Sequence, residues 1–349
     1  MQVLPLALFL VILELTVGSF VSLYLLDVRG DTSRGFVVFQ GVLYLVFAGL
    51  TLLAMNAFAT PEIVHGIGLD ERWVRAQGPL TLAFTLLLIP WNAVLWADKQ
   101  PRGAKRKAAD QQPPDPRALR LRRVRFALGA LVALVGLAAL VVDGMAYRTL
   151  ADSRLGGALV VLALVAGGLA LGGVMTAMLL GHWYLNTPTA SGKPLEFVTT
   201  LLLAALAAEL VFTVLIGPST AHPNPNLQAV APGTTIQTTG NGIVVTTPTP
   251  KPTVQAQATA QPGAAPSVQQ VQQVQQDEQR QAPLGQGAMV WLQFLMGFIA
   301  PLVLGGIALY LTRGRSFQSA TGMLYLCVSF VFIGEVIGRG LLLFATTGA

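Results

Sequence analysis

The sequence predicts an all-α membrane protein, a bundle of about eight transmembrane helices with a long disordered linker between the sixth and the seventh. Of the 349 residues, 53% are hydrophobic and only 11% are charged, and the mean hydropathy is +0.62, which is typical of a chain embedded in lipid. Eight apolar runs reach the length of about 20 residues that a membrane span needs. These runs show no alternation with a period of two, which favours helices over barrel strands.

Short loops separate most of the expected spans. The spans cover residues 4–26, 35–57, 79–97, 126–147, 156–184, 195–216, 289–311 and 320–345. The first span starts close to the N-terminus, but no basic region precedes it and Glu14 lies in its middle. We therefore interpret it as a retained span and not as a secretion signal.

Positive charge is concentrated in one loop. Segment 98–125 contains ten of the 22 Lys and Arg residues, and an excess of these residues marks the cytoplasmic side of a membrane. The alternation of spans then places loops 27–34, 185–194 and 312–319 on the same side and both termini outside. We expect a multi-pass protein of the cytoplasmic (inner) membrane, whose first partner is the lipid bilayer. The net charge of +6 then reflects orientation, and no nucleic-acid partner is expected.

The region between the sixth and seventh spans has a different composition. Residues 217–288 are mostly Pro, Thr, Gln, Ala and Val with few charges, which predicts a disordered extracytoplasmic linker. A folded sensor or binding module is the alternative, although large apolar residues for a core are few. A short β-hairpin near Thr234 to Thr247, turning at Gly240, is the only ordered element expected. The linker would divide a six-helix region, 1–216, from a two-helix region, 289–349, that packs on it.

Four ionisable residues fall inside the predicted spans, where a charge is costly unless it faces a partner, a cavity or a pathway. They are Glu14, Glu209, Glu335 and Arg339. Counted along the helices, Glu14 lies near mid-membrane and the other carboxyls lie in the outer half, so all four are expected to share one layer of the bundle.

Two interpretations of these groups stay open. Glu335 and Arg339 are four residues apart on one helix face, which favours an ion pair. The pair is either an internal salt bridge or a salt bridge that also contacts a ligand headgroup or relays protons. Glu14 and Glu209 have no partner nearby in the sequence, so we expect neutral carboxyl groups that make hydrogen bonds between helices.

The histidines and the cysteine limit the possible cofactors. His182 lies at the cytoplasmic end of the fifth span, where an interfacial histidine is either structural or part of a quinone or lipid headgroup site. Bis-histidine haem would need a second histidine at a compatible depth, and His65 and His222 are both predicted outside. Cys327 is the single cysteine, so the chain has no pair of thiols for a metal. Neither haem nor an iron–sulfur cluster is expected on this chain.

Further candidate residues lie in or near the outer half. His65 follows the second span, where the outer carboxyl groups would emerge, and a neutral imidazole there would exchange a proton with a quinol hydroxyl. An ordinary loop histidine is the alternative. Asp143, Trp91 and Asn92 are weaker candidates for lining an outer cavity.

Two stretches resemble a known family. Leu4-Pro5-Leu6 through Phe9 to Val17-Gly18-Ser19-Phe20, and Gly334-Glu335-Val336-Ile337-Gly338-Arg339 followed by Leu343-Phe344, are similar to the first and last helices of the membrane-anchor subunits of dimethyl sulfoxide reductase and polysulfide reductase. The resemblance implies eight helices with outward termini, menaquinol bound near the outer face, no cofactor of the chain's own, and electron transfer to an iron–sulfur subunit next to a molybdopterin subunit.

The leading hypothesis is therefore a quinol-interacting membrane-anchor subunit of a multi-subunit respiratory oxidoreductase. His65, Glu14, Glu209, Glu335 and Arg339 would form or support a site for the quinone headgroup in the outer half. The reductase chemistry would occur on another subunit. A small-solute or ion transporter is one alternative. A structural or assembly protein without a ligand, in which the buried charges only hold helices together, is the other.

Overall fold

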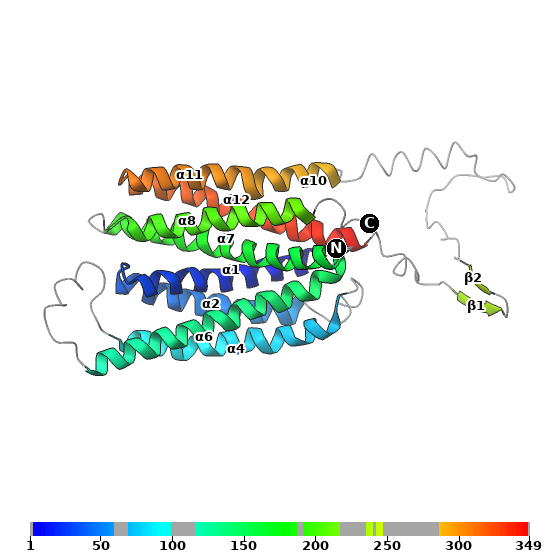
Figure 1. Ribbon diagram of the computed structural model, residues 1–349, viewed down its shortest axis with the longest axis horizontal. Helices are drawn as coiled ribbons and strands as arrows, with labels where there is room; N and C mark the ends of the chain where they lie inside the picture. The colour runs from blue at the N-terminus through cyan, green and yellow to red at the C-terminus, as the bar shows by residue number, and fades with distance from the viewer. Residues whose placement is uncertain are drawn as a thin grey trace, which may run out of the picture. The chain divides into compact units, whose positions relative to one another are not determined.

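Eight helices in the computed structural model are long and apolar enough to cross a membrane, which confirms the predicted all-α bundle (Figure 1). The structure describes residues 3–58, 69–98, 116–151, 153–187, 191–216, 235–239, 242–246 and 286–347.

The helices of the bundle alternate in direction along the chain (Figure 1). We call the end where α1 begins and α12 finishes the terminal end, and the opposite end, where α1 finishes and α2 begins, the basic end. The elements are α1 (Val3–Arg29), α2 (Arg34–Phe58), α4 (Glu71–Ala97), α6 (Pro116–Tyr147), the 3-10 turn η1 (Arg148–Leu150), α7 (Arg154–Asn186), α8 (Lys193–Ile216), α10 (Gln286–Gln293), the π-helical turn η3 (Phe294–Ile299), α11 (Ala300–Arg313) and α12 (Phe317–Thr347).

A small hairpin lies in the segment between α8 and α10. Strands β1 (Thr235–Thr239) and β2 (Gly242–Thr246) pair antiparallel, with Thr235 opposite Thr246, at the place where the sequence predicts a hairpin. The chain forms two compact units, one of residues 1–222 with 290–349 and the other of residues 223–289. The disordered linker over 217–288 stays a prediction.

Two helices begin earlier than the apolar runs predict. Helix α4 starts at Glu71 and not at residue 79, because Asp70 caps it by accepting a hydrogen bond from the Arg72 amide at 3.2 Å. Helix α6 starts at Pro116, a residue suited to the first helical position, and not at residue 126. The predicted loop 98–125 is therefore helical over its second part. A hydropathy count misses both starts because their first turns are charged.

The outward surface of the bundle is apolar. On the seventh span, Trp291 and Tyr310 are 76% and 77% exposed, and they are separated along the helix by about 28 Å. This separation is close to the hydrocarbon thickness of a bilayer, about 30 Å, so the two rings suit the two interfaces. Apolar side chains are also exposed on this span and on other spans of the bundle. They include Leu53, Leu134, Leu162, Leu215, Ile299 and Val303.

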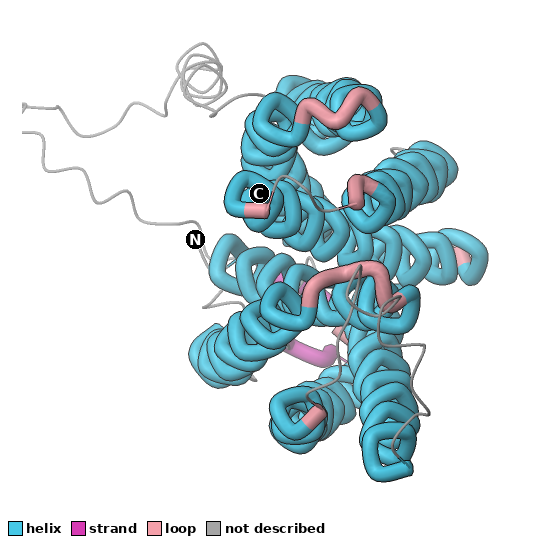
Figure 2. Tube along the Cα trace, turned by 90° about the vertical axis from the view of Figure 1, so that its left-hand side faces the viewer, coloured by secondary structure: helices cyan, strands magenta, loops and turns pink. Residues whose placement is uncertain are grey.

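Helix α7 contacts four other helices of the bundle. It packs against α1, α6, α8 and α12, and Figure 2 looks along the bundle and shows the helices packed side by side. Its contact with α1 is backbone on backbone: a β-carbon at Gly18 would run into the carbonyl group of Gly168, and one at Gly172 would run into the backbone of Gly18. We call Gly18, Gly168 and Gly172 the glycine seam. Small residues allow such close approach of membrane helices.

We expect Gly172→Ala to destabilise the folded protein by about 1–3 kcal/mol, because the added methyl group pushes α7 away from α1. The thermal unfolding midpoint in mild detergent measures the effect. Gly306→Ala on α11 is the matched control, since a β-carbon there meets no atom within 4 Å. Equal midpoints for the two variants would contradict the tight seam.

Candidate functional site

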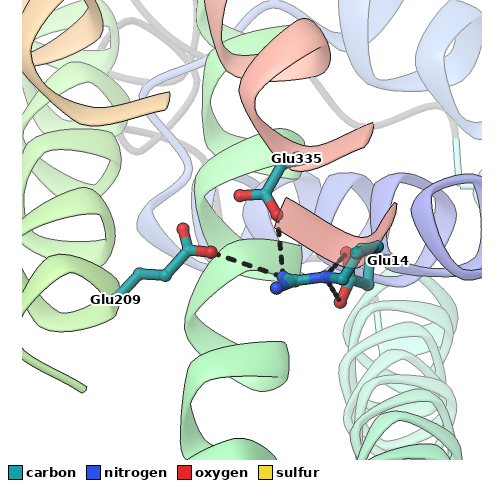
Figure 3. A network of polar contacts seen from close by, with 4 residues as sticks. Glu14, Glu209 and Glu335 are labelled. Atoms are coloured by element: carbon teal, nitrogen blue, oxygen red, sulfur yellow. Dashed lines mark hydrogen bonds and ion pairs between the residues drawn. The ribbon is translucent and has the colours of Figure 1, made fainter. Parts of the chain in front are cut away.

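The four ionisable residues predicted within the spans meet around one guanidinium group. The Nε atom of Arg339 donates to both carboxylate oxygens of Glu14, at 3.0 and 3.2 Å. The Nη2 atom lies 3.3 Å from Glu209 Oε1 and 2.8 Å from Glu335 Oε2. Figure 3 shows the three carboxyl groups converging from different helices. We call these four residues the acidic cluster.

Helix packing buries the acidic cluster deeply. Glu14 on α1 is 0% exposed, Glu209 on α8 is 2% exposed, and Glu335 and Arg339 on α12 are 5% and 6% exposed. The site depends on Gly167 of α7, where a β-carbon would collide with Arg339 Nη2 and lie 2.8 Å from Glu209 Oε1. The absence of a side chain at Gly167 therefore leaves the space in which the charged groups meet.

The charges of the acidic cluster do not balance. Three ionised carboxylates around one guanidinium would leave two excess negative charges, and a low-dielectric interior disfavours that state strongly. The carboxyl groups of Glu209 and Glu335 are close enough to share a hydrogen bond when one of them is protonated. The cluster is therefore suited to taking up protons, or to accepting a hydrogen bond from a bound molecule.

A second acidic group lies beside the cluster. Asp143 of α6 is 0% exposed, and it accepts a hydrogen bond from Gln77 Nε2. It lies close enough to Glu14 and Arg339 to interact with both electrostatically. Its other oxygen, Oδ2, is buried without a partner among the described residues. Asp143 thus extends the polar region from the acidic cluster toward the terminal end, one helical turn before Tyr147.

Another buried ion network lies at the basic end. Arg125 of α6 is 4% exposed. Its Nε atom lies 3.1 Å from Asp27 Oδ2, and its Nη1 atom binds Asp98 Oδ2. Arg34 donates to the carbonyl oxygen of Asp98 at 2.8 Å. From the sequence we expected Arg125 to be a cation of the loop. In the structure its ion pairs with Asp27 and Asp98 connect α6 to α1 and to the end of α4.

His182 does not join the acidic cluster. His182 is exposed near the basic end, and its Nδ1 atom lies 3.1 Å from the Tyr325 hydroxyl group. Along α7 it is about 22 Å from Gly167. His65 lies outside the described residues, so its position stays a prediction.

Trp91 and Asn92 lie away from the acidic cluster. Both are within six residues of the end of α4 at the basic end, where Asn92 donates to Gly41 O at 3.2 Å and Trp91 packs edge-on against Phe20 at 5.0 Å. That they line an outer cavity stays a prediction.

The interactions of the cluster agree with the expectations from the sequence. The i, i+4 pair of Glu335 and Arg339 forms as predicted, and the four groups share one layer. Glu14 and Glu209 make hydrogen bonds between helices, as expected, and their partner is Arg339 of α12. The sequence did not predict that Gly167 and Gln77 belong to the site. Gly167 indicated only close helix packing, and Gln77 lies before the predicted start of its span.

An apolar groove of about 420 Å³ opens between α1 and α2. Its lining residues include Ile12 and Leu15, on either side of Glu14 in the sequence. At 100° per residue these two side chains project away from Glu14 on the helical wheel. The groove and the acidic cluster therefore lie on different sides of α1, and the groove is a surface for lipid tails. Its other lining residues are Phe47, Leu50, Leu53, Ala54 and Ala57.

Comparisons with known proteins identify no relative, so the site is interpreted from its own chemistry. No family model, no curated protein and no solved structure matches the chain. The fold itself identifies a multi-pass membrane protein.

We expect Arg339→Leu to cost about 3–5 kcal/mol of stability at neutral pH, because it leaves three buried carboxyl groups without their counter-ion. Unfolding in detergent, followed by circular dichroism, measures the loss. The loss should shrink at acidic pH, since protonated carboxyl groups need no counter-ion. Arg313→Leu, an exposed change at the end of α11, is the control. A loss that does not depend on pH would contradict the role of Arg339 as counter-ion.

Proposed function

We propose that this chain is a quinol-interacting membrane-anchor subunit of a multi-subunit respiratory oxidoreductase. The acidic cluster would bind the headgroup of a quinone, such as menaquinone. The observation that carries the proposal is the buried excess of carboxyl groups around Arg339. A quinol hydroxyl group can donate a hydrogen bond to a carboxylate oxygen.

The proton count of the reaction supports the proposal. Oxidation of a quinol to a quinone releases two electrons and two protons. Neutralising the excess charge of the acidic cluster takes two protons, so the cluster would accept the two quinol protons as it releases two of its own to the outside. The electrons would pass to an iron–sulfur subunit that serves a molybdopterin subunit, the partners implied by the resemblance of the first and last helices to the reductase anchors.

The distribution of charge supports an orientation. Arg117, Arg120, Arg122 and Arg123 follow one another at the start of α6, at the basic end. With this end in the cytoplasm, both termini face outward in the inner membrane. The acidic cluster then lies in the outer half, and it would release its protons to the outside. His65, between α2 and α4, would take part in this release.

A proton-coupled transporter is a second candidate, favoured by one feature of the seventh span. The π-helical turn η3 interrupts the helix between α10 and α11, and π-turns often occur at functional sites. Its Gly297 packs on Gly334 so closely that a β-carbon on Gly334 would collide with Gly297 Cα. Gly334 precedes Glu335, so a movement of this span would reach the acidic cluster.

We expect the full chain, purified from native membranes in mild detergent, to carry extractable quinone and to retain iron–sulfur and molybdopterin subunits. Mass spectrometry of the subunits and of the organic extract measures both. Purification of the chain without oxidoreductase subunits and without quinone would contradict the proposal. Solute uptake into proteoliposomes that is driven by a pH gradient and lost in Glu209→Gln would favour the transporter instead.

In the assembled complex, we expect Glu209→Gln to lower the rate of quinol oxidation by about 10²-fold, because an amide cannot take up the proton. His65→Ala should lower it further. Glu71→Gln, a change in the exposed first turn of α4, is the control. Stopped-flow oxidation of a water-soluble quinol measures the rates, and wild-type rates in Glu209→Gln would rule out a proton-accepting role for the cluster.

A further inference from the structure

Six buried polar side chains lie at one depth between the two ion networks. Counted at the helical rise from the basic end of its own helix, each lies about 9–15 Å inside the bundle. They come from four helices: two from α1, two from α2, and one each from α7 and α8. We call them the polar layer, and they are Ser19, Ser22, Gln40, Tyr44, Thr176 and Thr199.

Contacts between the helices bring these side chains together. The Tyr44 hydroxyl group lies 2.8 Å from Thr176 Oγ1, and Thr176 Oγ1 also donates to the carbonyl oxygen of Ser19 at 3.5 Å. Gly173 of α7 packs against the backbone of Leu202 on the antiparallel α8. Three residues further along α7 and three back along α8, Thr176 and Thr199 are therefore level.

Half of the polar layer has no protein partner. Ser22 Oγ, Thr199 Oγ1 and both polar atoms of the Gln40 amide are buried without a hydrogen bond in the described part of the chain, and these three residues are 0% exposed. The Ser19 side chain is a hydrogen-bond partner of the Tyr44 hydroxyl group. An unsatisfied buried amide or hydroxyl group costs about 1–3 kcal/mol, so a layer of them in a dry interior would be a heavy penalty.

Other hydroxyl groups in this bundle avoid that penalty within their own helix. Thr16, Thr51, Thr81 and Thr312 each donate to the carbonyl oxygen four residues earlier, at 2.7–2.9 Å. This bond is available to any Ser or Thr in a helix. Among the described residues the side chains of Ser22 and Thr199 do not make it, so their hydroxyl groups can bind something else.

We propose that the polar layer binds a chain of internal water molecules that is reached from the basic end of the bundle. Buried water typically makes about three hydrogen bonds to polar groups that lack other partners, and Gln40 alone offers two donors and an acceptor. Asp27 lies one to two turns beyond Ser22 on α1, within the Arg125 network. This network is the polar entrance through which water reaches the layer.

The glycine seam closes the water chain on the other side. Gly18 adjoins Ser19, and its backbone contacts Gly168 and Gly172 directly, which leaves no room for water between α1 and α7 at that depth. Water therefore extends about 15 Å from the basic end and stops before the acidic cluster. This inference does not depend on the quinol proposal, because it concerns a different layer.

The accessibility of introduced cysteines tests the proposal. In full-length Cys327→Ala protein in native membrane vesicles, we expect Ser22→Cys to react with methanethiosulfonate ethylammonium about ten-fold faster than Leu23→Cys, because only a hydrated thiol ionises readily. Leu23 is the matched control, since it is adjacent and also 0% exposed. Gel-shift assay of the unreacted thiols gives the rates, and vesicles of both orientations show the side of entry.

A second pair of cysteine variants keeps the test valid if one variant does not fold. Thr199→Cys on α8 should react, and Leu202→Cys, 0% exposed and one turn deeper, should not. Melting temperatures equal to that of the Cys327→Ala protein show that a variant is folded. If folded Ser22→Cys or Thr199→Cys reacts as slowly as its control, the layer is dry and the proposal fails. Reaction only from the terminal end would overturn the proposed entrance.

Discussion

The burial of one guanidinium group constrains the whole bundle. Arg339 is 6% exposed, so its charge is balanced by side chains that include two from other helices. Glu14 and Glu209 supply that charge from α1 and α8, far from Arg339 in sequence. The first, sixth and last spans must therefore meet at one depth, although a long segment separates α8 from α10. The ion pairs fix which helices are neighbours more specifically than apolar packing does in lipid.

Glycine makes this meeting of charges geometrically possible. A side chain at Gly167 would occupy the space in which Arg339, Glu209 and Glu335 meet. The glycine seam brings α1 against α7 one turn away and holds Glu14 at the right depth. The same seam separates the acidic cluster from the polar layer. Glycines that read as a packing motif in the sequence thus determine both where charge gathers and where the bundle is closed.

The sequence predicted the fold well because lipid imposes a simple rule on it. Long apolar runs must be helices, and an ionisable residue deep in the membrane needs a partner. These two rules predicted from the sequence alone that Glu14, Glu209, Glu335 and Arg339 share one layer. The starts of α4 and α6 were predicted less well, because the first turns of these helices are charged and lie before the apolar run. The role of Arg125 was missed because a hydropathy profile cannot distinguish a buried cation at a helix end from a cation in a loop.

The two ion networks differ in a way that points to different roles. Asp27 and Asp98 carry one more charge than Arg125, but they lie at helix ends where Arg29, Arg34 and Arg122 are close in sequence or in space. An ion network that has further cations nearby at the membrane surface costs little free energy to bury. It is suited to holding helices together. The acidic cluster lies deeper and has Arg339 as its only cation among the described ion pairs. The pairs with Glu14 and Glu209 join α1 and α8 to α12, but one carboxylate is enough to balance the charge of Arg339, so the excess of carboxyl groups favours a site that binds protons.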